Sequence, residues 1–459
     1  MRKFDLIVIG SGSGLEVSAD VSDAGRSVAV IEEGPFGGTC LNRGCIPSKM
    51  LIHCADVMQT VQNAAAFGIH AKVERIDWRF IVQRAFEEVD ADAAMIERGN
   101  RQSDNIEVFK GHGRFTGPKI IAVTGPGLDE EELTADTILI AAGTRPWVPD
   151  IPGLDRTPYI TSDEALRLPE QPRRLTIIGG GYIAAELAHF FGALGTEVTI
   201  IHRRGLMLRE EDEDVSRRFT EVYQRRFNMM LDSQAAGVSS KNGEIIVEVT
   251  TPDGSKSIAS DTLLMATGRV PNTDSLEVAK TGVELNQRGY IKTDEHLQTN
   301  VPGIWALGDI VGRYLLKHNA NLEAAYASNN ILDPENQAAV DYHAMPHAVF
   351  ASPQVASVGL TQQEAEGRGA AYVAATYAYS DTAYGASIED KDGFVKVLAD
   401  PETGEILGCH IIGTDAATLI QEVANAMRLR LGVDAITQSI YVHPALPEVL
   451  QRAFGQLPV

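Results

Sequence analysis

The chain opens with an apolar stretch that leads directly into a glycine-rich turn, FDLIVIGSGSG at residues 4–14. An apolar run of this length before such a turn indicates a buried β-strand, and the residues after the turn suit a helix. A second apolar run, SVAVI at residues 27–31, ends in Glu32. The order strand, turn, helix, strand predicts a βαβ unit with a parallel sheet.

The glycines of this turn predict a binding site for a dinucleotide. Gly10, Gly12 and Gly14 let the backbone approach a pyrophosphate at a helix N-terminus. Glu32 can accept hydrogen bonds from ribose hydroxyls. The spacing departs from G-x-G-x-x-G, because the last glycine falls one residue before Leu15. With the strand, the helix and Glu32 in register, we expect dinucleotide binding.

The same pattern returns about 170 residues later in the chain. The stretch LTIIGGGYIA at residues 175–184 precedes a helical run and another apolar strand, VTII at residues 198–201. The candidate nucleotide contacts in this turn are Gly179, Gly181, Tyr182 and Ile183. Two such units predict two separate dinucleotide-binding domains.

The residues after the last strand of the second unit favour NADPH over NADH. His202, Arg203 and Arg204 stand where an acidic residue selects NAD. Basic side chains suit the 2′-phosphate of NADPH instead. A solvated basic turn is the alternative interpretation of the same residues.

Each unit is followed by an apolar strand that ends in a small-residue turn, ILIAAG at residues 138–143 and LLMATG at residues 263–268. These strands are expected to close the two nucleotide folds, and their turns end at Gly143 and Gly268. The last segment alternates strands and helices without a glycine fingerprint. The expected fold is therefore α/β, with two Rossmann-like domains and a C-terminal α+β interface domain. The predicted boundaries are 1–148, 149–270, 271–342 and 343–459.

Two cysteines five residues apart, in CLNRGC at residues 40–45, are the most specific feature of the chain. They lie at the start of a helix that we expect to begin at Pro47, and with a distorted first turn they can close a small disulfide loop. A helix N-terminus lowers the pKa of a thiol and favours the thiolate that exchanges disulfides. Two buried thiols or half a zinc site are the alternatives, but zinc-like partner ligands are lacking, and no metal site is predicted. Cys54 and Cys409 stand alone and are expected to be packing thiols.

A histidine near the C-terminus is a candidate acid–base. Thiol exchange needs a group that protonates the departing thiolate, and His443 held by Glu448 suits that role. A surface loop explains the same two residues when they are taken alone. The presence of the cysteine pair in the same chain is what favours the acid–base interpretation of His443 and Glu448.

The composition of the chain excludes several classes of partner. In 459 residues, 62 acidic and 40 basic side chains give a net charge of −22, which opposes nucleic acid and anionic membranes as partners. Four cysteines are too few for a secreted disulfide framework, and no secretory signal is expected, so we predict a reducing cytoplasm. The acidic runs at residues 129–132 and 210–214 are expected to be solvated loops.

Taken together, these motifs resemble those of the pyridine nucleotide-disulfide oxidoreductases from one end of the chain to the other. The resemblance is carried by GGTCLNRGCIPSK at residues 37–49, the second glycine turn, ATGR at 266–269, the string from Thr299 to Asp309, and His443-Pro444 with Glu448. It implies an FAD-containing homodimer that passes electrons from a nicotinamide to the flavin, to the cysteine pair and on to a small disulfide substrate. It assigns FAD to residues 1–148, completed by 271–342, NADPH to 149–270 and dimerisation to 343–459.

The resemblance also implies roles for the catalytic residues. Cys45 would face the flavin, and Cys40 would attack the substrate disulfide. His443, oriented by Glu448, would complete the active site of the other subunit of the homodimer.

The same resemblance implies further cofactor contacts. Lys49 and Glu186 would form an ion pair beside the flavin, and Tyr182 would gate the nicotinamide pocket. The remaining FAD contacts would be Gly38 and Thr39 before the cysteines, Glu32 on the adenosine ribose, Gly113 near the adenine, and Asp309 near the ribityl or pyrophosphate group.

Within the family the chain most resembles mycothione reductases, and next dihydrolipoamide dehydrogenases. The displaced glycine, YLLKHNAN at residues 314–321 and HPALPE at residues 443–448 favour the first group. Dihydrolipoamide dehydrogenases normally have a carboxylate in place of His202 and usually a histidine in place of Ala445. We therefore expect an NADPH-dependent reductase of a low-molecular-weight disulfide such as mycothione or bis-γ-glutamylcystine. An NAD-dependent dihydrolipoamide dehydrogenase and a non-enzymatic flavin redox sensor are the alternatives.

Overall fold

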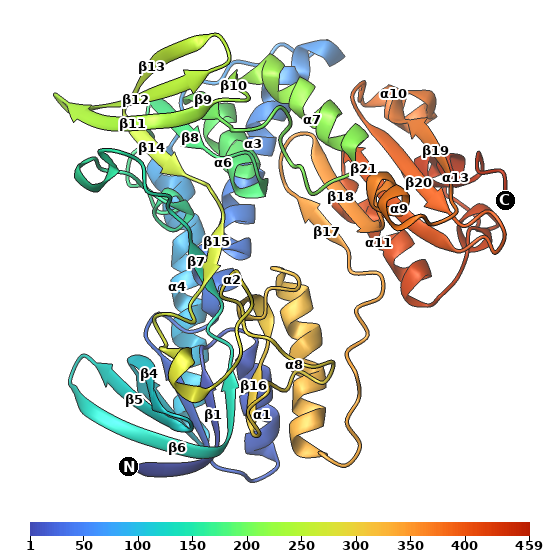
Figure 1. The fold of residues 1–459 in the computed structure, drawn as a ribbon. Coiled ribbons are helices and arrows are strands. Elements are labelled where there is room, and N and C mark those ends of the chain that lie inside the picture. The colour runs from blue at the N-terminus through green and yellow to red at the C-terminus, as the bar shows by residue number, and fades with distance from the viewer. The chain divides into compact units, whose positions relative to one another are not determined.

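The computed structural model describes the backbone of residues 1–459 and every side chain except those of residues 128 and 129. The chain forms two compact units, each assembled from three segments. The first unit contains Met1–Met50, Arg79–Trp147 and Gly268–Asp341, and the second contains Leu51–Trp78, Val148–Thr267 and Tyr342–Val459. Figure 1 labels the helices and strands of both units.

The first unit is built on a sheet whose centre is the predicted βαβ unit. Strand β1 (Arg2–Ile9) pairs in parallel with β2 (Val28–Glu32), and helix α1 (Gly14–Asp23) connects them. The strand order is β3-β2-β1-β6-β5-β4, with β16 beside β6. The other strands are β3 (Ile106–Lys110), β4 (His112–Gly117), β5 (Ile120–Gly125), β6 (Leu128–Ile140) and β16 (Ile304–Ala306). The predicted parallel sheet is confirmed for β1, β2, β3, β6 and β16.

Both faces of this sheet are covered. Ile7 and Val8 point to opposite faces of β1, and each is 0% exposed. This explains why β1 reads as a continuous apolar run rather than an alternating one. Helix α1 packs against α8 (Lys317–Leu332), and α4 (Trp78–Gln102) is the longest helix of the unit (Figure 1). None of the described helices is both long and apolar enough to cross a membrane.

A parallel sheet in the second unit contains the second predicted βαβ unit. Its strand order is β10-β9-β8-β14. The elements are β8 (Arg174–Ile178), α6 (Tyr182–Ala193), β9 (Glu197–Ile201), α7 (Glu213–Arg226), β10 (Asn228–Met230) and β14 (Thr262–Met265). A three-stranded antiparallel sheet of β11 (Gln234–Lys241), β12 (Glu244–Thr251) and β13 (Gly254–Ser260) is inserted before β14 (Figure 1).

The C-terminal part of the second unit is an antiparallel sheet in the order β17-β18-β21-β20-β19. Its strands are β17 (His347–Val349), β18 (Gln354–Gly359), β19 (Val373–Ala378), β20 (Phe394–Ala399) and β21 (Ile406–Gly413). Helices α11 (Ala416–Arg428) and α13 (Glu448–Phe454) pack on the sheet, and α9 (Gln362–Arg368) follows β18. The predicted fold class, two nucleotide folds and a C-terminal α+β domain, is therefore confirmed.

Both acidic runs differ from the solvated loops that the sequence suggested. Residues 129–132 belong to strand β6, which pairs with β5, although the side chain of residue 129 lies outside the described part. In the second run Glu211 is 4% exposed and Asp212 is 0% exposed. The expectation failed because it considered charge alone, whereas partners for Glu211 and Asp212 come from the C-terminal sheet.

Candidate active site

The first glycine turn combines close packing with a helix N-terminus. A Cβ atom at Gly14 would lie 2.9 Å from the side chains of both Val8 and Ala141, so the displaced glycine lets α1 approach the sheet closely. That is the task of the third glycine in the usual spacing, and Leu15 is consequently free to carry a side chain. A Cβ at Gly38 would lie 2.7 Å from the Cα of Gly12, so the segment before the cysteines packs directly on the turn.

Glu32 lies at the end of β2 and holds the same turn. Its Oε2 accepts hydrogen bonds from the Ser11 N–H at 2.9 Å and the Ser11 hydroxyl at 2.8 Å, and its Oε1 accepts one from the Gly34 N–H at 2.6 Å. A carboxylate has lone pairs beyond these three. Gly113 packs against Ile31 on the neighbouring part of β2, where a Cβ would lie 3.1 Å from the isoleucine.

Asp309 is half-buried beside the turn that ends β6. Burial raises the pKa of its carboxyl group, against the positive charge of Arg269 and a hydrogen bond from Thr144 at 3.1 Å. Gly143, in the same turn, has a φ of +63° and open space where a Cβ would be.

Glu323 was missed by the reasoning from sequence. It is 0% exposed on α8, and its Oε2 accepts a hydrogen bond from the Gly308 N–H at 2.5 Å, which fixes the residue next to Asp309. The surrounding run NLEAAYA gave no clear signal for this burial, because it also contains exposed and half-buried positions.

The cysteine pair lies at a break between two helices. Helix α2 (Gly38–Arg43) carries Cys40, and helix α3 (Cys45–Asn63) begins at Cys45 rather than at Pro47, which corrects the prediction. A Cβ at Gly44 would lie 2.8 Å from the carbonyl oxygen of Thr39, so the break is as tight as a glycine allows. The tight break brings the two sulfur atoms together.

Neither cysteine is in a disulfide, and the two thiols are hydrogen-bonded to each other. The hydrogen bond with Cys45 and burial raise the pKa of the Cys40 thiol, and the charge of Lys317 opposes that shift. The predicted lowering of a thiol pKa is therefore wrong for Cys40. Cys45 is the first residue of the 19-residue helix α3, where the helix dipole favours a thiolate.

The side chains of Asn42 and Lys317 hold the backbone and polar groups near the cysteines in place, and reasoning from the sequence did not find either of them. The Asn42 amide donates to the carbonyl oxygens of Phe36 at 2.8 Å and Gly38 at 3.0 Å, across the loop before α2. The Lys317 ammonium donates to the Ser13 hydroxyl at 2.7 Å and to the Asn321 amide oxygen at 2.5 Å.

The second glycine turn opens α6. Gly181 is its N-cap and has open space where a Cβ would be, and Tyr182, the first residue of the helix, is 45% exposed. Ile183 follows it and is half-buried. Glu186, one turn on, is buried and accepts a hydrogen bond from the Phe350 N–H at 2.9 Å. The ion pair of Glu186 with Lys49 stays a prediction, because the two residues belong to different compact units.

The three basic residues after β9 do not act alike. The ring of His202 packs on Gly180, where a Cβ would lie 2.5 Å from it, and its Nε2 donates to the Leu206 carbonyl at 3.1 Å. Burial lowers the pKa of His202, so at neutral pH its ring is uncharged and its Nδ1 is an acceptor. The ring of His202 is thus held by packing and by one backbone carbonyl, and its predicted contact with a 2′-phosphate stays a prediction. Arg203 and Arg204 are exposed and, among the described residues, are in no ion pair.

Arg203 also borders a cavity of 490 Å³ lined by Ser233, Gln234 and Thr250.

His443 and Glu448 form the predicted pair. The Nδ1 of His443 lies 2.9 Å from Glu448 Oε1, and Glu448 Oε2 accepts the Ala445 N–H at 3.0 Å. The hydrogen bond with His443 lowers the pKa of Glu448, so the carboxylate is ionised and Nδ1 donates. The His443 side chain is 72% exposed, and its Nε2 is left to exchange a proton.

Comparison with known proteins places these features in one family. Residues 4–324 match the family described as pyridine nucleotide-disulphide oxidoreductase, and residues 345–454 match its dimerisation domain. The chain belongs to this family. Like its members, it is an FAD-dependent pyridine nucleotide-disulphide oxidoreductase, which acts on sulfur groups.

Several curated members of the family are similar over nearly their whole length. The chain is 37% identical to mycothione reductase of Mycobacterium tuberculosis over 99% of both proteins. It is 35% identical to glutathione reductase of Burkholderia cepacia over 97% of both, and 32% identical to dihydrolipoyl dehydrogenase of Corynebacterium glutamicum over 98% of this chain and 97% of that one. A solved structure of the HOCl-induced flavoprotein disulfide reductase RclA from Escherichia coli has a TM-score of 0.86 and 28% identity, over 98% of this chain and 99% of that one.

The residues of the first unit fit FAD. Gly38 has no room for a Cβ beside the backbone of Gly12, so the two glycines form a turn of bare backbone, which suits close approach to a pyrophosphate. Glu32 at the strand end has acceptors for ribose hydroxyls, and the open turn at Gly143 lies beside the half-buried carboxyl of Asp309.

Proposed function

We propose that this oxidoreductase uses NADPH to reduce the disulfide of a low-molecular-weight thiol. The observation that carries the proposal is the hydrogen-bonded pair of Cys40 and Cys45 at the break between α2 and α3, in which the pKa of the Cys40 thiol is raised and Cys45 begins a long helix. A thiol with a raised pKa needs a base before it can attack a disulfide. His443, whose Nδ1 lies 2.9 Å from Glu448, is proposed as that base.

The proposed reaction of the cysteines is a two-step thiol–disulfide exchange. Nε2 of His443 takes the proton of Cys40, whose sulfur attacks one sulfur of the substrate; the substrate S–S bond breaks, and His443 returns the proton to the departing thiolate. Cys45 then attacks Cys40 in the mixed disulfide, and the second thiolate leaves and is protonated from solvent. Two thiols and a Cys40–Cys45 disulfide result. FAD, when bound, passes two electrons from the nicotinamide to this disulfide.

FAD is proposed to bind to residues 1–148, completed by 271–342, with contacts from the first glycine turn, Gly38, Thr39, Lys49, Gly113, Gly143, Asp309 and the carboxylate of Glu32. The pyridine nucleotide is proposed to bind to residues 149–270, at Gly179, Gly181, Tyr182, Ile183, Glu186 and Gly268. The FAD assignment is supported by the fold, because segments 1–50 and 268–341 belong to the same compact unit.

NADPH rather than NADH is proposed as the electron donor. Arg203 and Arg204 are exposed after β9 with no ion pair among the described residues, so their charge is available to a 2′-phosphate. Arginine suits this task because its planar fork binds phosphate oxygens in pairs. The names of the two reductase relatives are consistent with this choice.

The enzyme is proposed to be a homodimer in which His443 serves the active site of the partner subunit. Residues 345–454 match a dimerisation domain, and beside His443 the side chains of Ile440 and Val442 are 101% and 78% exposed. Exposed apolar residues next to a catalytic group are typical of an interface that assembles a site. A cytoplasmic location is proposed, since thiols of this kind need a reducing compartment.

Rates with a panel of substrates test the proposal. Purified protein and NADPH are to be assayed with mycothione, bis-γ-glutamylcystine, glutathione disulfide and lipoamide. Turnover of one of the first three, with NADPH preferred to NADH, is expected. Turnover of lipoamide alone, with NADH preferred, would establish a dihydrolipoamide dehydrogenase instead. Full reduction of the flavin without turnover of any disulfide would favour a redox sensor.

A further inference from the structure

The loop that carries Arg203 and Arg204 ends in a buried cluster of charges on the C-terminal sheet. The loop leaves β9 at Ile201 and enters α7 at Glu213. The role inferred for its far end rests on the proposed function, in which the two arginines hold the 2′-phosphate of NADPH.

The near part of the loop is fixed by the nucleotide fold itself. The Leu208 N–H donates to the carbonyl oxygen of Gly180 at 2.8 Å, and Leu208 is buried with a left-handed φ of 52°. The Ser216 hydroxyl donates to the Leu208 carbonyl at 2.7 Å. These contacts hold the backbone, but none of them reaches the two guanidinium groups.

Glu211 ties the far end of the loop to two strands of the C-terminal sheet. Its Oε1 lies 2.8 Å from Nε2 of His347 on β17, and its Oε2 accepts the hydroxyl of Ser357 on β18 at 2.7 Å. Its backbone carbonyl accepts the Gln363 amide from α9 at 2.8 Å. Although burial opposes it, the hydrogen bond with His347 lowers the pKa of Glu211, so the group is a carboxylate.

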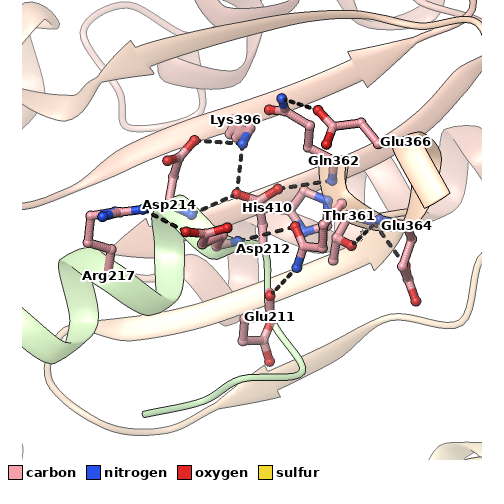
Figure 2. A network of polar contacts seen from close by, with 12 residues as sticks. Glu211, Asp212, Asp214, Arg217, Thr361, Gln362, Glu364, Glu366, Lys396 and His410 are labelled. Atoms are coloured by element: carbon pink, nitrogen blue, oxygen red, sulfur yellow. Dashed lines mark hydrogen bonds and ion pairs between the residues drawn. The ribbon is translucent and has the colours of Figure 1, made fainter. Parts of the chain in front are cut away.

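Asp212, the residue after Glu211, connects the loop to a third strand of the C-terminal sheet. Its Oδ1 accepts the ammonium of Lys396 on β20 at 2.8 Å, and its Oδ2 accepts the Gln362 N–H at 3.1 Å. Lys396 also donates to Asp214 at 2.6 Å (Figure 2). Lys396 is 4% exposed and Asp212 0%, so the pair is little screened by water.

His410 on β21 lies beside both carboxylates and completes the cluster (Figure 2). It is 0% exposed, and burial lowers its pKa, so its ring is neutral; Nε2 donates to the Leu360 carbonyl at 2.8 Å. Strands β17, β18, β20 and β21 therefore all contribute to the site that receives residues 211–212.

We propose that Glu211 and Asp212 are positioning residues, through which the C-terminal sheet sets the loop so that Arg203 and Arg204 can bind the 2′-phosphate. Bidentate binding of phosphate by arginine depends on placement within about 1 Å. A carboxylate left without its buried partner shifts rather than stays in place, because an uncompensated buried charge is costly. Recognition of the phosphate then depends on side chains some 140–190 residues further along the chain.

The test compares two ligands that differ only in the phosphate concerned. Adenosine 2′,5′-bisphosphate and 5′-AMP are to be titrated by calorimetry into the FAD-containing enzyme, and the ratio of their affinities measures 2′-phosphate recognition without any turnover. The variants are Lys396→Met and the milder Glu211→Gln, which keeps the shape of the side chain. Lys391→Met, which removes an exposed lysine paired with Glu389, is the matched control. Flavin content and circular dichroism confirm that each variant is folded.

A positioning role predicts that Lys396→Met and Glu211→Gln lower the affinity ratio by about 3- to 30-fold, with the affinity for 5′-AMP nearly unchanged. The control should keep the wild-type ratio. A merely structural role would weaken both ligands equally, and an unchanged ratio in folded Lys396→Met and Glu211→Gln would overturn the inference.

The double variant Arg203→Ala with Arg204→Ala separates this inference from the proposed function. It is expected to abolish the preference for the bisphosphate, and adding Lys396→Met to it should then change nothing further. A preference that survives loss of both arginines would refute the role of Arg203 and Arg204 in binding the 2′-phosphate, and the inference with it. A wild-type enzyme without any preference for the bisphosphate would refute the NADPH assignment. A preference lost with the arginines but kept in Lys396→Met and in Glu211→Gln would refute the inference alone.

Discussion

A Cβ atom at Gly10 would lie 2.5 Å from the carbonyl oxygen of Ala141, the residue just beyond strand β6. The second nucleotide fold repeats this contact, since a Cβ at Gly179 would lie 2.1 Å from the carbonyl oxygen of Ala266, just beyond β14. In both folds the first glycine of the turn packs on the backbone where the closing strand ends. In each nucleotide fold, therefore, the glycine turn and the small-residue turn pack against each other.

Replacing either glycine with alanine should remove one cofactor selectively. Gly10→Ala is expected to lose FAD, and Gly179→Ala to keep FAD but lose binding of NADP⁺, because each Cβ would meet a backbone carbonyl that cannot move aside. Flavin absorbance and calorimetry measure the two effects. Gly25→Ala is the control: its φ is +77° but nothing lies within 4 Å of a Cβ, so it should cost only about 1–2 kcal/mol of stability. Equal losses of FAD in Gly10→Ala and Gly25→Ala would contradict this account.

Cys40→Ser and Cys45→Ser should each abolish turnover of disulfides, since the exchange needs both sulfur atoms. Reduction by NADPH, seen as bleaching of the flavin absorbance, should persist in both. Cys54→Ser should keep turnover within about twofold of the wild type, because Cys54 is not one of the two exchanging sulfur atoms. Disulfide turnover by Cys40→Ser would remove the basis of the proposed reaction.

His443→Gln should lower kcat for the disulfide by about 10²- to 10⁴-fold, the usual contribution of a general acid–base. Glu448→Gln should have a smaller effect, because Nε2 remains while its orientation and charge are weakened. Since the pKa of Glu448 is lowered, the carboxylate is ionised throughout the assay range, and the pH profile of kcat should contain no titration of Glu448 above its ordinary pKa. Flavin reduction by NADPH should be unaffected by either change, and a parallel loss there would argue against a proton-transfer role.

The contact of His347 with Glu211 should make stability depend on pH. Burial works against the charged ring, but the hydrogen bond and charge of Glu211 outweigh it and raise the pKa of His347 above 6.5. A raised pKa means that the stabilisation is fully present below pH 6.5 and is lost as the pH rises through the higher pKa of the folded protein. The difference in unfolding free energy between wild type and His347→Gln should therefore be largest at about pH 6 and shrink towards alkaline pH. A difference that grows with pH would contradict the assignment.

Much of the fold could be predicted because its signals are local. A strand, a glycine turn and a helix are adjacent in the chain, so the two βαβ units at Gly10 and Gly179 were predicted correctly. The start of the helix that contains Cys45 was predicted two residues too late, because proline is common in the first turn of a helix and Pro47 was taken as its first residue. The actual start follows the break at Gly44, which depends on a contact with Thr39.

The candidate site was harder to predict where a role depends on distant partners. The packing of the His202 ring against Gly180 could not be predicted from the position of His202 after β9. Glu211 and Asp212 look like a solvated acidic run until strands far along the chain supply His347 and Lys396. Neither the burial of a charge nor its compensation is written in the residues that surround it in the sequence.

The buried cluster at Glu211 and Asp212 also bears on how the protein can be re-engineered. Exchange of the C-terminal segment for that of a relative would separate two carboxylates from the side chains of His347, Ser357 and Lys396. A chimera designed to pair a new dimer surface with this cofactor loop must therefore transplant those three residues as a set. Alternatively, the loop, helix α7 and the C-terminal sheet can be exchanged together, so that the carboxylates keep their own partners.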